Sequence, residues 1–345
     1  MGNGQPPGGA AFKGNLSGSN TALIKKKPRL LPWLAIIKIV RIYVQIMNYI
    51  IIIWFTSRKG YVIKEILGSK MYLDRTDPGI SSHLYIDGIR EAISVGVVKR
   101  MLKEGDVTVE VGANIGYYAL LESRLIGGSG KVYAIEPSKD NIELLRRNIE
   151  LNGRTNIDTY ECAIGDTNGY APIYLMKQRN LNTLRDVAGT EKEAYLARKT
   201  EVRVMTLDEF IRDKRYPSLV RMDVEGYEYQ VIKGMKNILA QKLPLILFIE
   251  FHFHLLKKEE TVEIFEILRQ SGFHIAVAAS ESPFLGQHRY KLLSRLMRFV
   301  EPEIARAKGR RPLNQELNLT FDDILSNPSI MSGQWGTLHL FFARD

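Results

Sequence analysis

Short apolar runs alternate with amphipathic stretches from residue 61 to the end of the chain. The apolar runs are rich in Val, Ile, Tyr and Phe, which is typical of buried strands. Strands are expected at residues 107–111, 131–137, 157–165, 218–226, 244–252, 273–279 and 337–344. Apolar residues three and four apart predict helices at residues 117–126, 138–153, 228–240 and 260–272. Strands that alternate with helices of this length form an open, mostly parallel α/β sheet with both faces covered.

The first 60 residues follow a different pattern. Residues 1–22 are rich in Gly, Asn, Ser and Pro, which predicts a disordered tail because they bring too little apolar surface to fold. Residues 30–55 form a long apolar run, and its polar interruptions fall on one narrow stripe of a helix. These interruptions are Lys38, Arg41, Gln45 and Asn48. We expect residues 23–60 to form a basic, hydrophobic, amphipathic helix that associates with a membrane surface.

Two alternatives for this helix stay open. It is long enough to span a bilayer. It could instead pack on protein, for example on the second subunit of a homodimer.

The charge of the chain is concentrated at its N-terminus. The net charge is +10, yet the first 60 residues hold nine Lys or Arg and no acidic residue, so the remaining chain is nearly neutral. This distribution favours an anionic membrane surface as partner and does not favour nucleic acid. The single cysteine, Cys162, excludes a disulfide framework and indicates a reducing compartment. The expected location is therefore the cytoplasmic face of a membrane.

Small and acidic residues at three strand ends point to a nucleoside ligand. Gly112, Asn114 and Gly116 follow the strand at 107–111, where glycines let a ligand approach the backbone at a helix start. Glu136 ends the next strand, where a carboxylate can accept hydrogen bonds from both ribose hydroxyls. In the third strand, Ala163 is placed to flank an adenine together with its neighbours Cys162 and Asp166. These residues predict an adenosine-bearing cofactor and leave NAD and S-adenosylmethionine open.

Carboxylates gather after the fourth and fifth strands. Asp223 lies near the end of the strand expected at 218–226 and is our first candidate for a general base and also a candidate cofactor contact. His252 is the second candidate for the base. Glu250 lies beside His252 and completes the candidate catalytic set. Asp223, Glu225, Glu250 and His252 are also residue types that could bind a divalent ion, but nothing fixes their spacing. The sequence therefore assigns no metal.

Several segments together resemble the FkbM family of S-adenosylmethionine-dependent methyltransferases. They include VEVGANIGYY (109–118), AIEPSKDNIELLRRNI (134–149), RMDVEGYEYQVIKGM (221–235) and FIEFH (248–252). The resemblance covers about residues 61–279 and implies a Rossmann-like methyltransferase fold, with seven strands of which the last is antiparallel. It also implies S-adenosylmethionine as cofactor, a cofactor contact for Glu110 in place of the usual Asp, and methylation of a hydroxyl group. Arg221 stands where the family more often has Lys.

The expected domain organisation follows. Residues 61–345 form the methyltransferase domain, and an insertion at about 280–336 serves as a lid or acceptor-binding segment. The expected function is O-methylation of a glycan, a lipid or a similar small acceptor. A nicotinamide-dependent oxidoreductase and a catalytically degenerate membrane scaffold are the alternatives. The first lacks a Tyr-x-x-x-Lys motif in a suitable place, and the intact glycine loop argues against the second.

Overall fold

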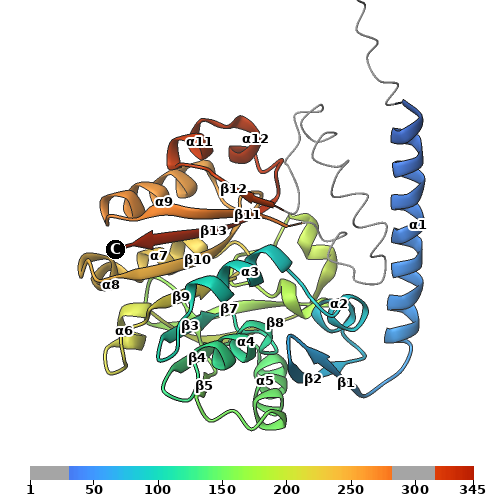
Figure 1. The fold of residues 1–345 in the computed structure, drawn as a ribbon, viewed down its shortest axis with the longest axis horizontal. Coiled ribbons are helices and arrows are strands. Elements are labelled where there is room, and N and C mark those ends of the chain that lie inside the picture. Colours follow the sequence, from blue (N-terminus) through green and yellow to red (C-terminus); the bar gives the residue numbers. More distant parts are fainter. Residues whose placement is uncertain (1–30, 282–314) are drawn as a thin grey trace, which may run out of the picture. The chain divides into compact units, whose positions relative to one another are not determined.

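The computed structural model describes residues 31–281 and 315–345, and the chain divides into two units at Met47 and Asn48. The helix α1 (Leu31–Thr56) begins in the first unit and ends in the second (Figure 1). It confirms the helix expected near residues 30–55. Among the described residues, no helix is both long enough and apolar enough to cross a membrane. The tail at 1–22 and the basic part of the insertion, at 282–314, lie outside the described residues.

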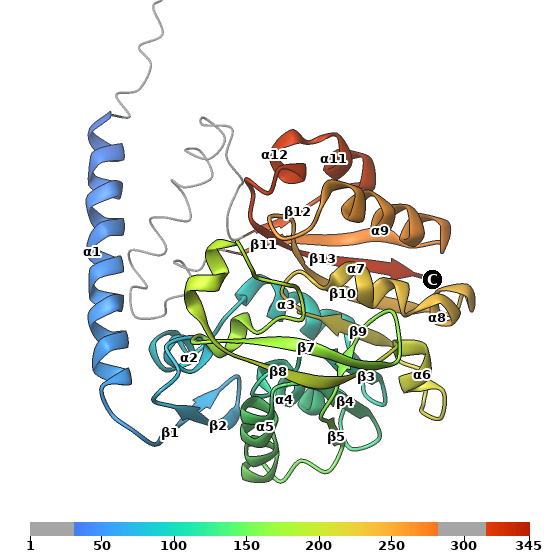
Figure 2. The same cartoon turned by 180° about the vertical axis from the view of Figure 1, so that it is seen from behind.

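The second unit is built on an eight-stranded sheet (Figures 1 and 2). Its strands, in spatial order, are β12 (Gln315–Leu317), β11 (His274–Ser280), β13 (Thr337–Arg344), β10 (Leu245–His252), β9 (Leu219–Met222), β3 (Val107–Val111), β4 (Lys131–Ile135) and β5 (Ile157–Tyr160). The strands from β10 to β5 are parallel, and β13 is antiparallel to both of its long neighbours. The predicted mostly parallel sheet with an antiparallel last strand is therefore confirmed. The short β12 at the edge adds an eighth strand to the seven expected.

Helices cover both faces of this sheet. One face packs on α6 (Leu207–Ile211), α7 (Glu228–Lys233), α8 (Lys236–Ala240), α9 (Lys258–Gln270), α11 (Phe321–Ser326) and α12 (Pro328–Met331). The other packs on α2 (Ile80–Asp87), α3 (Ala92–Met101), α4 (Tyr117–Leu125) and α5 (Lys139–Leu151). The hairpin of β1 (Tyr61–Ile66) and β2 (Ser69–Asp74) joins the second face. Alternate side chains of each strand thus enter two separate apolar layers, as period-two strands require.

A second, three-stranded sheet was not expected from the sequence. It contains β6 (Ala163–Ile164), β8 (Leu196–Met205) and β7 (Gly169–Met176), with the short 3₁₀ helices η1 (Arg179–Leu181) and η2 (Glu191–Tyr195) between β7 and β8 (Figure 2). The strand predicted at 157–165 is wrong as one element, because its first half joins the main sheet and its second half joins this one. The helix predicted at 228–240 is also divided, into α7 and α8, and Gly234 lies between them. At this point the chain passes so close to the backbone of Gly165 that a Cβ on residue 234 would lie 2.0 Å from the Gly165 carbonyl oxygen.

The domain boundary also lies further toward the N-terminus than the expected residue 60. Phe55, in the last turn of α1, is 0% exposed and belongs to the apolar layer of the second unit. Its ring lies 4.8 Å from that of Tyr85, and its carbonyl oxygen accepts a hydrogen bond from Arg75 Nε at 3.3 Å. The last turns of α1 are therefore part of the folded domain, which begins at Asn48.

Candidate active site

The loop between β3 and α4 has a backbone that glycine alone adopts without strain. Gly112 has a φ of 87°, and a Cβ there would lie 2.1 Å from the carbonyl oxygen of Asp223. Gly116 has a φ of 95°, and a Cβ there would lie 2.6 Å from Leu145. Asn114 between them also has a positive φ, of 51°, which Asn tolerates better than most residues. These two glycines thus bring the loop against the end of β9 and against α5.

A pocket opens beside this loop at the carboxyl ends of β3 and β4. Its walls come from the glycine loop, the end of β4, the turn before β6, the loop after β9 and the segment around η1. The lining includes Gly112, Asn114, Glu136, Asn141, Cys162, Ala163, Arg179, Thr183, Asp223, Glu225 and Tyr227. A buried carboxylate beside small and apolar walls fits the ribose and the base of an adenosine.

Glu136 is the most deeply buried carboxylate of this pocket, with 4% of its surface exposed. One oxygen accepts from the backbone N–H of Asn114 at 2.9 Å, and the other accepts from the N–H of Ser138 at 2.9 Å and from Asn141 Nδ2 at 3.4 Å. Burial raises its pKa to about 7, although these three donors oppose the shift. A carboxylate that keeps unused lone pairs in a desolvated pocket is well suited to accept ligand hydroxyls.

The structure brings together most of the predicted cofactor residues. Gly112, Asn114, Glu136, Ala163 and Asp223 all line the pocket, whereas Gly116 shapes the loop behind it. Their contact with the cofactor stays a prediction.

Glu110 is the exception among the predicted cofactor residues. It is fully buried and does not line the pocket, and its Oε2 lies 3.3 Å from Arg221 Nη1. The expected cofactor contact for Glu110 is therefore replaced by a buried ion pair. The reason is its side of the strand: it alternates with Val109 and Val111 and enters the opposite layer.

An acidic cluster lies at the carboxyl ends of β9 and β10, next to the pocket. His252 Nδ1 lies 2.7 Å from Glu228 Oε1, which orients the imidazole. Its Nε2 lies 3.7 Å from both Glu225 Oε1 and Glu250 Oε1. Asp223 adds a fourth carboxylate. The candidate catalytic residues Asp223, Glu250 and His252 therefore meet at one edge of the sheet, but their roles stay predictions.

Arg221 is the main cation behind this cluster. The Nη2 atom lies 3.4 Å from Asp223 Oδ2 and 3.7 Å from Glu250 Oε2, while Nη1 reaches Glu110. The guanidinium also stacks 4.0 Å from the centroid of the Tyr118 ring. A planar, always charged group that contacts several carboxylates and a ring is a role that Arg fills better than Lys. This packing gives a physical reason for Arg at position 221.

Crowding of carboxylates shifts the protonation of the cluster. Burial and the neighbouring Glu250 raise the pKa of Asp223 well above its usual range, while Arg221 opposes the shift. Burial alone would lower the pKa of His252, but the carboxylates of Glu225 and Glu228 raise it well above its usual value. Asp223 and His252 therefore keep their protons to a higher pH than usual. Burial would also raise the pKa of Glu250, but His339, His252 and Arg221 hold it well below its usual range.

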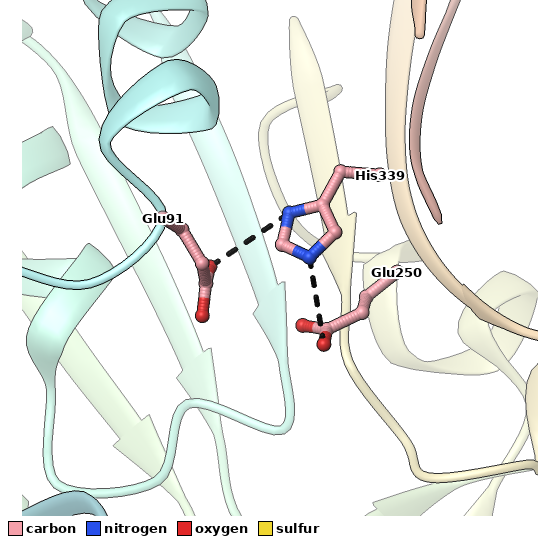
Figure 3. A group of neighbouring side chains, drawn as sticks. All are labelled: Glu91, Glu250 and His339. Carbon is pink, nitrogen blue, oxygen red and sulfur yellow. Dashed lines mark ion pairs between the residues drawn. The ribbon is translucent and has the colours of Figure 1, made fainter. Parts of the chain in front are cut away.

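A second histidine supports Glu250 from the neighbouring strand (Figure 3). His339 on β13 pairs in register with Glu250 on β10, and its Nε2 lies 3.5 Å from Glu250 Oε1. Its Nδ1 lies 2.9 Å from Ser94 Oγ and 3.9 Å from Glu91 Oε2. Glu91 precedes α3 with a φ of 52° and accepts a hydrogen bond from the Tyr118 hydroxyl at 2.9 Å. This arrangement fixes the position of the Glu250 carboxylate.

Sequence reasoning missed part of this site. The only sequence signal for His339 is a histidine inside the apolar strand TLHLFFAR, at a position that faces the same layer as Glu250. Arg179 and Thr183 reach the pocket through the unexpected second sheet, and Glu91 through a loop before α3. No local pattern marks these three residues, because they approach the site from distant parts of the chain.

A sheet in this strand order, with a pocket over the ends of β3 and β4, is the arrangement of a Rossmann-like methyltransferase. Residues 110–275 match the methyltransferase FkbM domain, so this part of the chain is a domain of that type, as its motifs predicted. The domain is S-adenosylmethionine-dependent, so the prediction of this cofactor is confirmed.

Individual relatives cover less of the chain. A protein-L-isoaspartate O-methyltransferase of Methanothrix thermoacetophila is 38% identical over 20% of this chain and 32% of its own length. A hexuronic acid methyltransferase of Haloferax volcanii is 28% identical over 41% of this chain and 56% of its own. A precorrin-6y C5,15-methyltransferase structure from Geobacter metallireducens has 10% identity and a TM-score of 0.37, over 74% of this chain and 91% of that one. The chain thus spans about a third of the isoaspartate relative and just over half of the hexuronic acid relative.

Proposed function

We propose that this chain is an S-adenosylmethionine-dependent O-methyltransferase that acts on a hydroxyl group of a glycan, a lipid or a similar small acceptor. One observation carries the proposal. Asp223 lines the cofactor pocket and also belongs to the acidic cluster at the carboxyl ends of β9 and β10. A carboxylate at this junction stands between the methyl donor and an acceptor that enters over the cluster.

The chemistry assigns Asp223 the task of general base. S-adenosylmethionine supplies a methyl group on a sulfonium, whose departing thioether is neutral and needs no acid. The proton of the acceptor hydroxyl must still leave, and a carboxylate of raised pKa is, in its ionised form, a stronger base than an ordinary one. Arg221, whose Nη2 lies 3.4 Å from Asp223 Oδ2, offsets the charge of the ionised carboxylate before it takes this proton. His252 is the second candidate for this task, and Glu228 orients its imidazole. Glu250 is the third member of the candidate catalytic set.

A sugar-like acceptor has support from one relative. The Haloferax volcanii protein is named for hexuronic acid, and the isoaspartate protein for O-methylation. Both names favour an oxygen nucleophile, and the first favours a carbohydrate. An acidic cluster over the acceptor side also suits a neutral polyol, because hydroxyls donate hydrogen bonds to carboxylates.

We also propose that α1 binds the cytoplasmic face of a membrane. Large apolar side chains on this helix remain in contact with solvent: Ile39, Ile42, Tyr43, Ile46, Tyr49, Ile50, Ile53 and Trp54 are 45–67% exposed. Exposed apolar side chains in this number favour an interaction surface. The basic residues of the first 60 positions supply the complementary attraction to anionic lipid.

Two measurements test the enzymatic proposal. Calorimetry with S-adenosylmethionine, S-adenosylhomocysteine and NAD should show binding of the first two ligands only. Incubation with methyl-labelled cofactor and native glycan and lipid extracts should then give a labelled product. A methyl ether resists mild alkali, whereas a methyl ester is hydrolysed. An alkali-labile product would contradict hydroxyl methylation, and NAD binding alone would favour the oxidoreductase.

A further inference from the structure

We propose that Asp223, Glu225, Glu250 and His252 bind one divalent cation beside the cofactor pocket. This inference rests on the proposed function and deepens it. Candidate ligand atoms of Asp223, Glu225 and His252 lie within 4.8 Å of one another. A cation with bond lengths of about 2.0–2.3 Å places opposed ligands about 4.0–4.6 Å apart. Small side-chain movements are therefore enough to close this set around an ion.

His252 is already held in the orientation of a metal ligand. Glu228, which is 0% exposed, forms a hydrogen bond of 2.7 Å with His252 Nδ1. The Nε2 atom of His252 is then directed at the carboxylates of Glu225 and Glu250. A ligating histidine usually donates its second ring N–H to a carboxylate in this way. The 3.7 Å from Nε2 to Glu225 and to Glu250 is too long for a hydrogen bond. It is close to the separation of neighbouring ligands that share a metal.

Carboxylate oxygens of the cluster lack donors. Asp223 Oδ1, Glu228 Oε2 and Glu250 Oε2 are buried and receive no hydrogen bond from the part of the chain that the structure describes. Glu250 is 9% exposed, and its Oε2 has a long 3.7 Å ion pair with Arg221. A buried carboxylate oxygen without a donor is costly, and a cation would satisfy it.

The charges also leave room for a divalent ion. Four carboxylates meet here, those of Asp223, Glu225, Glu228 and Glu250. The cationic side chains paired with them are Arg221 and Lys192, whose Nζ lies 2.9 Å from Glu225 Oε2. Carboxylates therefore outnumber the arginine and lysine side chains here. A divalent ion would compensate part of this excess when it displaces the proton of His252.

The ligand set indicates the kind of ion and its use. Carboxylates suit Mg²⁺ and Mn²⁺, and one imidazole among them favours a first-row ion such as Mn²⁺. A hydroxyl that binds to such an ion has a lowered pKa. Because Asp223 and Glu225 also line the cofactor pocket, the ion would hold the acceptor hydroxyl at the pocket edge. Asp223 would remain near enough to receive its proton.

The test is a titration of the full-length chain with Mn²⁺ after treatment with a chelator, with free Mn²⁺ followed by electron paramagnetic resonance. We expect one saturable site per chain, and at least tenfold weaker binding in Glu225→Gln and in His252→Asn. The matched control is Glu263→Gln, which removes an exposed carboxylate that accepts a hydrogen bond from Tyr229. This variant should bind Mn²⁺ as tightly as the wild type. Melting temperatures show which variants fold. If Glu225→Gln or His252→Asn does not fold, Glu228→Gln is measured in its place, because Glu228 orients His252. No saturable site in the wild type, or wild-type binding in folded Glu225→Gln, overturns the proposal.

A second measurement separates this inference from the proposed function. S-adenosylmethionine binding and label transfer are measured on the same chelated protein. Full transfer in the chelator overturns the cation site and leaves the methyltransferase intact. Mn²⁺ binding without any S-adenosylmethionine binding supports the cation site and contradicts the proposed function. Transfer that is lost in the chelator and restored by Mn²⁺ supports both.

Discussion

At the scale of single residues, Glu136 shows how one buried carboxylate can decide cofactor binding. Both of its oxygens are oriented by backbone N–H groups and face the pocket lining. Hydrogen bonds to a charged group are worth about 1.5–3 kcal/mol each. Glu136→Ala should therefore weaken S-adenosylmethionine binding at least tenfold by calorimetry. The control is Glu143→Ala, because Glu143 is exposed on the same helix as Asn141. An unchanged dissociation constant in Glu136→Ala would remove Glu136 from the site.

The pKa of Glu136, raised to about 7, gives a second prediction. Ribose hydroxyls donate to the ionised carboxylate, so affinity should fall as the pH drops below 7, approaching tenfold per pH unit, and level off above it. In the free protein the native state holds this proton up to a higher pH than the unfolded state. The group therefore stabilises the fold at low pH, and this contribution is lost as the pH rises from about 4.5 to 7. Calorimetry at several pH values tests this, and parallel profiles for wild type and Glu136→Gln would contradict it.

Asp223 is the residue whose change should separate catalysis from cofactor binding. Asp223→Asn keeps the size of the side chain but removes the base, so turnover should fall roughly 10²-fold or more while cofactor affinity changes little. Asp213→Asn, on an exposed carboxylate, is the control. Label transfer and calorimetry are the measurements. A joint loss of binding and of thermal stability would instead assign Asp223 a structural role through its contact with Arg221.

The sequence could predict site residues that lie at or just after the carboxyl end of a strand. Gly112, Asn114, Glu136, Ala163 and Asp223 all follow this rule and line one pocket. Glu110 did not, because its neighbours in the motif do not tell on which face of the strand a carboxylate lies. The partners of His252 could not be predicted either, since a side-chain hydrogen bond depends on packing between elements far apart in the sequence.

At the scale of elements, the glycine loop is set by its backbone. Gly112→Ala combines a positive φ with a Cβ that would lie 2.1 Å from a carbonyl oxygen of the neighbouring strand end. We expect a loss of about 2–5 kcal/mol in unfolding free energy and weakened cofactor binding. Gly153→Ala, at a φ of 58° with open space around it, should cost only about 1–2 kcal/mol. Denaturant unfolding measures both, and equal losses would show that the contact with β9 does not matter.

Element order was predictable because hydrophobic periodicity and strand composition agree along most of the chain. The strands at 107–111 and 337–344 are found with the predicted bounds. The second sheet was missed for a physical reason. β8 is exposed along most of its length and carries charged residues, and the first half of β7 is mostly exposed and includes Gly169 and Pro172, so neither strand is apolar along its whole length. Their pairing with each other stabilises them, and this is a long-range property.

At the scale of the whole molecule, charge and packing give two different positions for the start of the folded domain. Charge alone places the boundary after the last basic residues, near residue 60. Packing places it at Asn48, because Phe55 is a fully buried core residue. A sequence reading could not detect this, since Phe55 is one apolar residue among many in residues 30–55. Its burial in the apolar layer, against Tyr85 and Arg75, distinguishes it from its exposed neighbours.

Two truncations test this boundary and the membrane proposal together. Deleting residues 1–47 removes seven basic residues and leaves the compact unit intact, so the product should fold and bind S-adenosylmethionine but no longer sediment with anionic vesicles. Deleting residues 1–59 also removes Phe55, and loss of a buried Phe costs about 3–5 kcal/mol, so this product should unfold at a clearly lower temperature.

In the full chain, Lys38→Glu with Arg41→Glu should weaken binding to anionic vesicles more than to neutral ones, since it reverses charge and keeps the apolar surface. High salt should release the wild type only in part, because apolar burial is not screened. A full-length chain that ignores vesicles and forms a dimer would show that α1 packs on protein instead.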